Sequence, residues 1–236
     1  MNERSFLCNV LDSKKLLEDW GVLKTSSLNI YKSSSEKFSD SFLNQSKKND
    51  YFSLYKCAIE NDDYDFLLKD NSFFQFAYDN ITEKKCEVIR LAFYQAAEVC
   101  SYEDFLVNEL DEDIEKCGSE YLALYQQYIS EQEPPIIYML RYDYDRSLYK
   151  NQIHSAAHIH FGDAENIRVP INTQLKPSGF VKLVLEYFYY KDWETLVNTG
   201  DKSIWITEHD TEILDKAMFD EDDQLLPYLF VHNRKK

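Results

Sequence analysis

The chain contains little of what marks a disulfide-stabilised or disordered protein. Its 236 residues include only five glycines, five prolines and five cysteines, whereas 44% are hydrophobic. Few glycines and prolines at this hydrophobic content exclude wholesale disorder and indicate a folded protein with a substantial core. The cysteines are scattered, odd in number and never arranged as C-x-x-C. This pattern argues against a disulfide framework or a zinc ribbon and favours a reducing cytosol.

Positive charge is also scarce. The chain has 26 lysines and arginines against 42 aspartates and glutamates, a net charge of -16. A general nucleic-acid binder relies on a basic surface that releases counterions, so we expect weak binding of DNA or RNA by the chain alone. Nucleic acid would be met at a local site or through a partner. Acidic residues concentrate at 111–120 and 208–223, which we interpret as solvated helix ends and loops or as a docking surface for a basic partner.

Several sequence signatures are missing. Residues 1–11 have no basic segment followed by an apolar run, and no stretch approaches the roughly 18 apolar residues of a membrane span. We therefore expect no membrane partner and a cytoplasmic location. The chain has no G-x-G-x-x-G, P-loop, G-x-S-x-G or H-E-x-x-H motif. Intrinsic ATP-driven work is excluded, and any catalytic site has to be found from other patterns.

Short apolar and aromatic runs separated by Asp- and Asn-rich turns predict an antiparallel sheet. Aspartate and asparagine tolerate the left-handed backbone that tight turns need. Aromatic residues, 15% of the chain, suit the half-buried surface of a sheet. We expect a meander at 51–59, 64–68, 73–78 and 86–94, and later strands at 136–145, 156–161 and 167–171.

Apolar residues at helical spacing occupy other parts of the chain. The clearest helix opens at Pro177, where apolar residues recur at intervals of three and four. The fold class is therefore α+β, a curved antiparallel sheet, made of a meander plus later strands, packed with helices. We expect residues 1–49 to form an N-terminal helical segment and 50–236 a single α+β domain with a helical insertion at about 102–131. The expected helices are 4–20, about 38–43, 102–130, 177–188 and 211–219, followed by an apolar run at 225–231.

The densest group of chemically active side chains joins three of the five histidines to a polar run that precedes them. It comprises Arg141, Asp143, Asp145, His154, His158 and His160. Alternate side chains of a strand share a face, so Arg141, Asp143 and Asp145 share one face of a strand. In the same way, His158 and His160 share one face of the next strand. Because the connection is short, we expect these strands to pair and their functional groups to converge.

Three interpretations of this group remain open. In the first, a divalent ion such as zinc, manganese or magnesium activates water for hydrolysis, while Arg141 or Arg168 stabilises phosphate charge. Its candidate ligands are His154, His158, His160, Asp143 and Asp145. In the second, histidine and arginine bind an anion or phosphate without a metal. In the third, Arg141, Asp143 and His158 form a buried network that holds the register of the sheet.

Several strings of the sequence also carry a family resemblance. They are the run 65–76, Arg141 to Asp145, H-x3-H-x-H at 154–160, R-x-P at 168–170 and the helix 177–190. Together they resemble an uncharacterised bacterial domain-of-unknown-function family whose members occur beside a helicase in two-gene anti-phage defence systems. Two positions depart from the family pattern: Asn71 stands where glycine is expected, and Arg146 stands where proline is expected.

The resemblance implies a role beside a helicase from the same operon, which would supply nucleic-acid binding and ATP hydrolysis. One hypothesis is an effector that cleaves nucleic acid with the help of a metal. Its catalytic residues would be Asp143, His158, His160, Arg141 and Arg168. The other hypothesis is a non-enzymatic partner whose acidic segment 208–223 docks on a basic surface of the helicase and regulates it.

Overall fold

The computed structural model describes residues 1–33, 36–48, 50–81, 86–96, 102, 105–110, 120–131, 139–150, 153–162, 168–200 and 203–214. The chain divides into two compact units. The larger comprises Met1–Gln95 with Tyr138–Lys236, and the smaller comprises Ala96–Ile137. Among the described residues, none of the helices combines the length and apolarity that crossing a bilayer requires.

The larger unit is built on a seven-stranded sheet whose strands lie in sequence order. Every neighbouring pair is antiparallel. The strands are β1 (Leu23–Ser26), β2 (Phe66–Leu68), β3 (Phe73–Ile81), β4 (Cys86–Tyr94), β5 (Met139–Asp145), β6 (Ala157–Phe161) and β7 (Arg168–Pro170). With the helices packed on this sheet, the predicted α+β class is confirmed.

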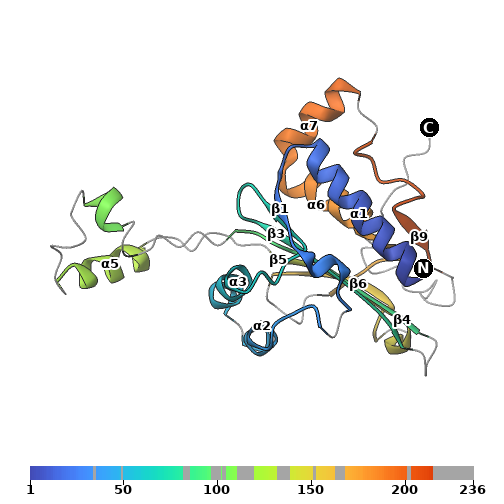
Figure 1. Cartoon of the computed structure of the whole chain (residues 1–236), viewed down its shortest axis with the longest axis horizontal. Helices are drawn as coiled ribbons and strands as arrows, with labels where there is room; N and C mark the ends of the chain where they lie inside the picture. The colour runs from blue at the N-terminus through green and yellow to red at the C-terminus, as the bar shows by residue number, and fades with distance from the viewer. Residues whose placement is uncertain are drawn as a thin grey trace. The chain divides into compact units, whose positions relative to one another are not determined.

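Side-chain alternation gives the sheet two different faces. In β5, Leu140, Tyr142 and Tyr144 are buried, while the residues between them are only half-buried. The buried set belongs to the main core, which also takes in residues of α1 (Glu3–Asp19) and α6 (Pro177–Phe188). Figure 1 shows both helices on one side of the sheet, together with α7 (Tyr190–Thr199).

The opposite face is covered in part by two helices, α2 (Asp40–Gln45) and α3 (Tyr51–Glu60) (Figure 1). Their residues Phe42, Leu54 and Ala58 form a second core with aromatic residues at one end of the sheet. The segment leading into α2 is fixed to the sheet by a buried ion pair, in which Lys37 Nζ lies 2.8 Å from Asp65 Oδ1. Beyond α2 this face carries the polar residues of the central strands.

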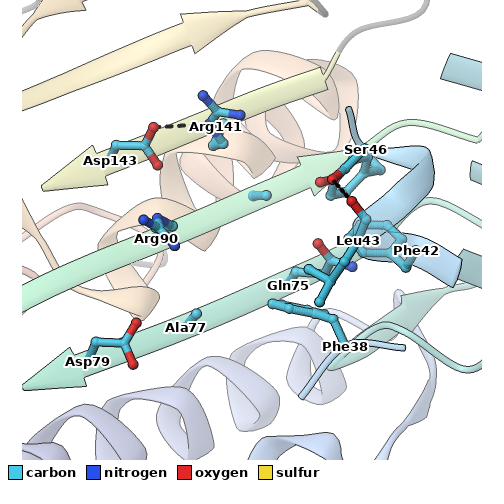
Figure 2. Close-up of a pocket in the computed structure, with 12 residues that line it drawn as sticks. Phe38, Phe42, Leu43, Ser46, Gln75, Ala77, Asp79, Arg90, Arg141 and Asp143 are labelled. Atoms are coloured by element: carbon cyan, nitrogen blue, oxygen red, sulfur yellow. Dashed lines mark hydrogen bonds and ion pairs between the residues drawn. The ribbon is translucent and has the colours of Figure 1, made fainter. Parts of the chain in front are cut away.

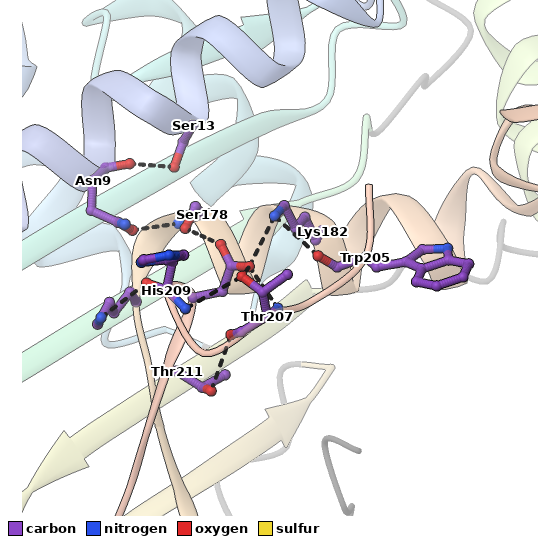
Figure 3. Close-up of polar contacts among 10 residues, drawn as sticks. Asn9, Ser13, Ser178, Lys182, Trp205, Thr207, His209 and Thr211 are labelled. Carbon is purple, nitrogen blue, oxygen red and sulfur yellow. Dashed lines mark hydrogen bonds and ion pairs between the residues drawn. The ribbon is translucent and has the colours of Figure 1, made fainter. Parts of the chain in front are cut away.

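A two-stranded sheet, β8 (Thr173–Leu175) with β9 (Thr211–Ile213), is tied to the start of α6. The buried Asp210 carboxylate accepts hydrogen bonds from Ser178 Oγ and from Lys182 Nζ, the latter at 2.9 Å. It also accepts from the backbone N–H of Thr207 at 2.8 Å. Figure 3 shows how these contacts hold the segment before β9 against α6. We refer to them as the Asp210 clasp.

Most of the described residues of the smaller unit are helical. They include a π-helix, η2 (Phe105–Glu109), and α5 (Glu120–Glu131). The Phe105 ring packs on Tyr125 and Tyr128, with centroids 5.5 and 4.9 Å apart.

Two of the expected elements are wrong. Residues 51–59 belong to helix α3 instead of the first strand of a meander; Asp50 caps it by accepting from Ser53 N at 3.2 Å. Residues 211–213 form β9 instead of a helix. Strands β1 and β8 and helix α7 were not anticipated. The apolar run 225–231, the acidic residues 111–119 and those after 214 lie outside the described residues.

Candidate functional site

The pairing of β5 with β6 brings the polar side chains of both strands together. Asp143 lies opposite His158, and Arg141 lies opposite His160. His160 Nε2 is 3.2 Å from Asp143 Oδ2, and His158 Nε2 is 3.9 Å from the same oxygen. Arg141 Nε donates to that oxygen at 3.0 Å. The predicted convergence of these four groups is confirmed, and we call them the β5–β6 cluster.

Alternation along β6 explains why both histidines face the same way. Ala157 and Ile159 are buried in the main core, so the residues between and after them point to the opposite face of the sheet. On β7, Pro170 lies opposite His158 and Arg168 lies opposite His160. Strands on both sides therefore enclose the histidines, whose exposed fractions are 5% for His158 and 2% for His160.

Burial and neighbouring charge set the protonation of the β5–β6 cluster. Burial disfavours the imidazolium form and lowers the pKa of His158 to about 4, against the attraction of Asp143. Burial alone would raise the pKa of Asp143, but the contact with His160 and the charge of Arg141 outweigh it and hold that pKa below its ordinary value. Near neutral pH the cluster thus combines a carboxylate with a neutral His158, the forms in which these side chains bind a cation.

Three buried polar atoms of the β5–β6 cluster have no hydrogen-bond partner within the described part of the chain. They are Asp143 Oδ1, His158 Nδ1 and His160 Nδ1. A buried polar atom without a partner costs about 1–3 kcal/mol, so native proteins rarely leave one in place without a reason. The three atoms lie on one strand pair, where an ion, water or a substrate could satisfy them.

The geometry of the β5–β6 cluster fits a divalent cation. One ligand atom each from Asp143, His158 and His160 can be chosen so that all lie within 4.8 Å of one another. Bonds of about 2.0–2.2 Å place neighbouring ligand atoms roughly 3.3–3.6 Å apart around a tetrahedral ion. The Nε2 atoms of His160 and His158 lie 3.2 and 3.9 Å from Asp143 Oδ2, on either side of this range. The three partnerless atoms are the other carboxylate oxygen and the other ring nitrogens of these side chains. Two imidazoles and one carboxylate leave at least one coordination position open for water.

The other residues predicted for the site, His154 and Asp145 as ligands and Arg168 as a catalytic residue, are not part of this ligand group. His154 has its Nδ1 3.0 Å from the backbone oxygen of Ser155, and its ring meets His158 edge-on at 5.1 Å. Asp145 Oδ1 accepts from the backbone N–H and the hydroxyl of Ser147, at 2.8 and 2.7 Å, and so caps the short 3-10 helix η4 (Arg146–Leu148). Arg168 is exposed on β7. Their assigned roles stay predictions.

A pocket with a volume of about 560 Å³ opens beside the β5–β6 cluster. Figure 2 shows its polar end over the strands, with Arg141, Asp143, Arg90 and Asp79, and its apolar end under the residues of α2 and the segment before it. Arg90 lies opposite Asp143 on β4. Sequence reasoning missed Arg90, although a lone arginine between the buried Ile89 and Leu91 was a usable signal for an open face.

Comparison with known proteins gives one result. Residues 19–226 match the family described as an uncharacterized conserved protein (DUF2290). No curated protein and no solved structure is significantly similar to the chain. The match covers most of the sequence, including β1–β9 and thus the β5–β6 cluster. The chain therefore belongs to the DUF2290 family of uncharacterised conserved proteins.

Proposed function

We propose that the chain is a divalent-metal-dependent hydrolase that cleaves phosphodiester bonds of nucleic acid and acts with a helicase partner in anti-phage defence. The observation that carries the hydrolase proposal is the group of Asp143, His158 and His160 next to Arg141, with three buried atoms that have no hydrogen-bond partner in the described part of the chain. The helicase partner and the defence role are supported by the family resemblance in the sequence.

The chemistry follows from what each residue can do. An ion held by the two imidazoles and the carboxylate would lower the pKa of a bound water and polarise a phosphoryl oxygen. Arg141 positions Asp143 through its Nε–H, and its charge helps His160 to hold the pKa of that carboxyl below its ordinary value. Its remaining N–H donors make no other hydrogen bond within the described residues, so they are available to a phosphate. Arg168, exposed on the neighbouring strand, is the second candidate for this contact.

The net charge of the chain supports a model in which a partner, and not the chain itself, binds most of the nucleic acid. At -16 the chain repels a polyanion, so its own site is expected to bind nucleic acid weakly. A helicase would deliver an opened strand at high local concentration. The rival proposal, an acidic docking surface at 208–223, rests on fewer described residues. Glu208 and Glu212 are exposed and could contribute to such a surface, whereas Asp210 is turned inward and used by the Asp210 clasp.

The test is a cleavage assay on labelled DNA and RNA oligonucleotides, with the purified chain alone and with its helicase, in Mn²⁺, Mg²⁺ or Zn²⁺ and in EDTA. We expect metal-dependent cleavage that Asp143→Asn abolishes. A matched control is Asp12→Asn, which removes an equal charge from an exposed position on α1 and should leave cleavage unchanged. Cleavage that persists in EDTA, or none with any of these ions and the helicase present, contradicts the proposal.

A further inference from the structure

We propose that the pocket beside the β5–β6 cluster binds one unpaired nucleotide, with the base at the α2 end and a phosphate at Arg90 and Arg141, so that single-stranded nucleic acid is the preferred ligand. Which phosphodiester bond of the bound strand would be cleaved depends on the proposed hydrolase function. The binding of the nucleotide does not depend on it. A volume of about 560 Å³ is in the range of pockets that hold small ligands of nucleotide size.

The apolar end of the pocket offers a surface for a base. Phe38 is half-buried and its ring lies 5.5 Å from that of Phe42, at 35°. Leu43, 42% exposed, completes this end (Figure 2). Base-on-aromatic stacking tolerates any base, because every base presents a π-face. This end of the pocket therefore suits a nucleobase without dictating which one.

The aromatic wall is held in place by the sheet. Ser39 caps α2 by accepting from Phe42 N at 3.1 Å, and its own N–H donates to Asp63 Oδ1 at 2.7 Å. The buried Lys37–Asp65 ion pair fixes the residue just before Phe38. A wall anchored on both sides loses little conformational entropy when a ligand stacks on it, which favours binding.

The polar end of the pocket is shaped by small residues placed opposite the arginines. Ala77 on β3 lies opposite Arg90, and Ala92 on β4 lies opposite Arg141. The two methyl side chains leave free space above the sheet at this point, so a ligand can lie between the two guanidinium groups. Each guanidinium can bind a phosphate through a pair of N–H donors. Asp79 and Asp143 balance this charge, so a bound divalent ion would strengthen the attraction for phosphate.

A base paired inside a duplex cannot reach the apolar end. Its faces are covered by neighbouring bases, and exposing one of them costs a few kcal/mol of unstacking and unpairing. The free-energy cost is much smaller for a single strand, because its bases are already free to splay outward. The pocket should therefore discriminate against duplex even though phosphates are present in both.

The test is fluorescence anisotropy of a short labelled single strand and of a blunt duplex at low salt, in EDTA so that hydrolysis does not contribute. We expect the single strand to bind at least about tenfold more tightly than the duplex, about 1.4 kcal/mol. Phe38→Leu, which keeps apolar volume but removes the ring, and Arg90→Gln should each weaken single-strand binding about fivefold or more. The controls Phe52→Leu and Arg4→Gln change the same residue types at exposed positions outside the pocket and should stay within about twofold of the wild type.

Equal affinity for duplex and single strand, or no effect of Phe38→Leu and Arg90→Gln, overturns the inference. So does the absence of single-strand binding up to about 1 mM. These outcomes are distinct from failure of the proposed function. Strand binding that depends on Phe38 without any metal-dependent cleavage leaves the nucleotide pocket standing and removes the hydrolase, whereas cleavage that is insensitive to Phe38→Leu does the reverse.

Discussion

Replacing His158 by leucine separates a ligand site from a structural network, because the two make opposite predictions for stability. His158 is 5% exposed, its Nδ1 has no partner among the described residues, and its Nε2 is 3.9 Å from Asp143, too far for a hydrogen bond. Leucine has similar bulk without polar atoms. Removing a partnerless buried atom returns about 1–3 kcal/mol. Losing the ring contacts with His154 and His160 costs about 0.5–1.5 kcal/mol each.

These contributions nearly cancel, so we expect the ion-free stability of His158→Leu to lie within about 1 kcal/mol of the wild type, a melting shift of about 2–4 °C. Excess Zn²⁺ or Mn²⁺ should then raise the wild-type melting temperature, since an ion at one hundred times its Kd adds about 2.7 kcal/mol. The variant should lose most of this gain. The assay is thermal melting followed by circular dichroism, in EDTA and in metal.

Exposed His209 supplies the control, because His209→Leu removes a histidine outside the β5–β6 cluster and should keep the metal response. The reasoning is refuted if His158→Leu melts in EDTA more than about 8 °C below the wild type. That loss would be at least 2 kcal/mol and would indicate a histidine needed to hold the sheet together.

Three further predictions concern the fold and its pH dependence. The pKa of His158 is about 4 in the folded chain, whereas its ordinary value is 6.5. As pH falls from 6.5 to 4, this histidine therefore becomes protonated mainly in the unfolded chain, which stabilises the unfolded state relative to the folded one. The ion-free protein should therefore lose on the order of 2–3 kcal/mol across this window in urea unfolding, and His158→Leu should lose less. Lys37→Met leaves the fully buried Asp65 without its cation and should cost about 3–5 kcal/mol in urea unfolding, against no measurable change for Lys56→Met at an exposed position of α3. Gly179→Ala places a Cβ 2.5 Å from the backbone oxygen of Asp210, so the Asp210 clasp must shift; a fall of about 1–3 kcal/mol is expected, and an unchanged melting temperature would contradict it.

The β5–β6 cluster could be predicted from the sequence because strand alternation is a local property. Once β5 and β6 pair, the positions of Asp143 and His158 follow from counting residues along each strand. The convergence needed no knowledge of the rest of the chain.

The other wall of the pocket could not be predicted in this way. Residues 51–59 are an example: Tyr51, Leu54, Tyr55 and Ala58 follow helical spacing, but a short apolar run fits a strand as well as a helix. Phe38 and Arg90 line one pocket because α2 and the residues before it lie over the sheet, which no local pattern encodes. The acidic run around Asp210 indicates a charged surface, yet the partners of Asp210 on α6 make it an internal anchor.

Elemental analysis of the purified chain by mass spectrometry tests the central claim most directly. After exposure to Zn²⁺ or Mn²⁺ and removal of free ion, the wild type should retain about one ion per chain. The double variant His158→Ala/His160→Ala should retain none while keeping the far-ultraviolet circular dichroism spectrum of the wild type. A wild type that retains no ion after either treatment, or a correctly folded double variant that retains as much as the wild type, would contradict the account.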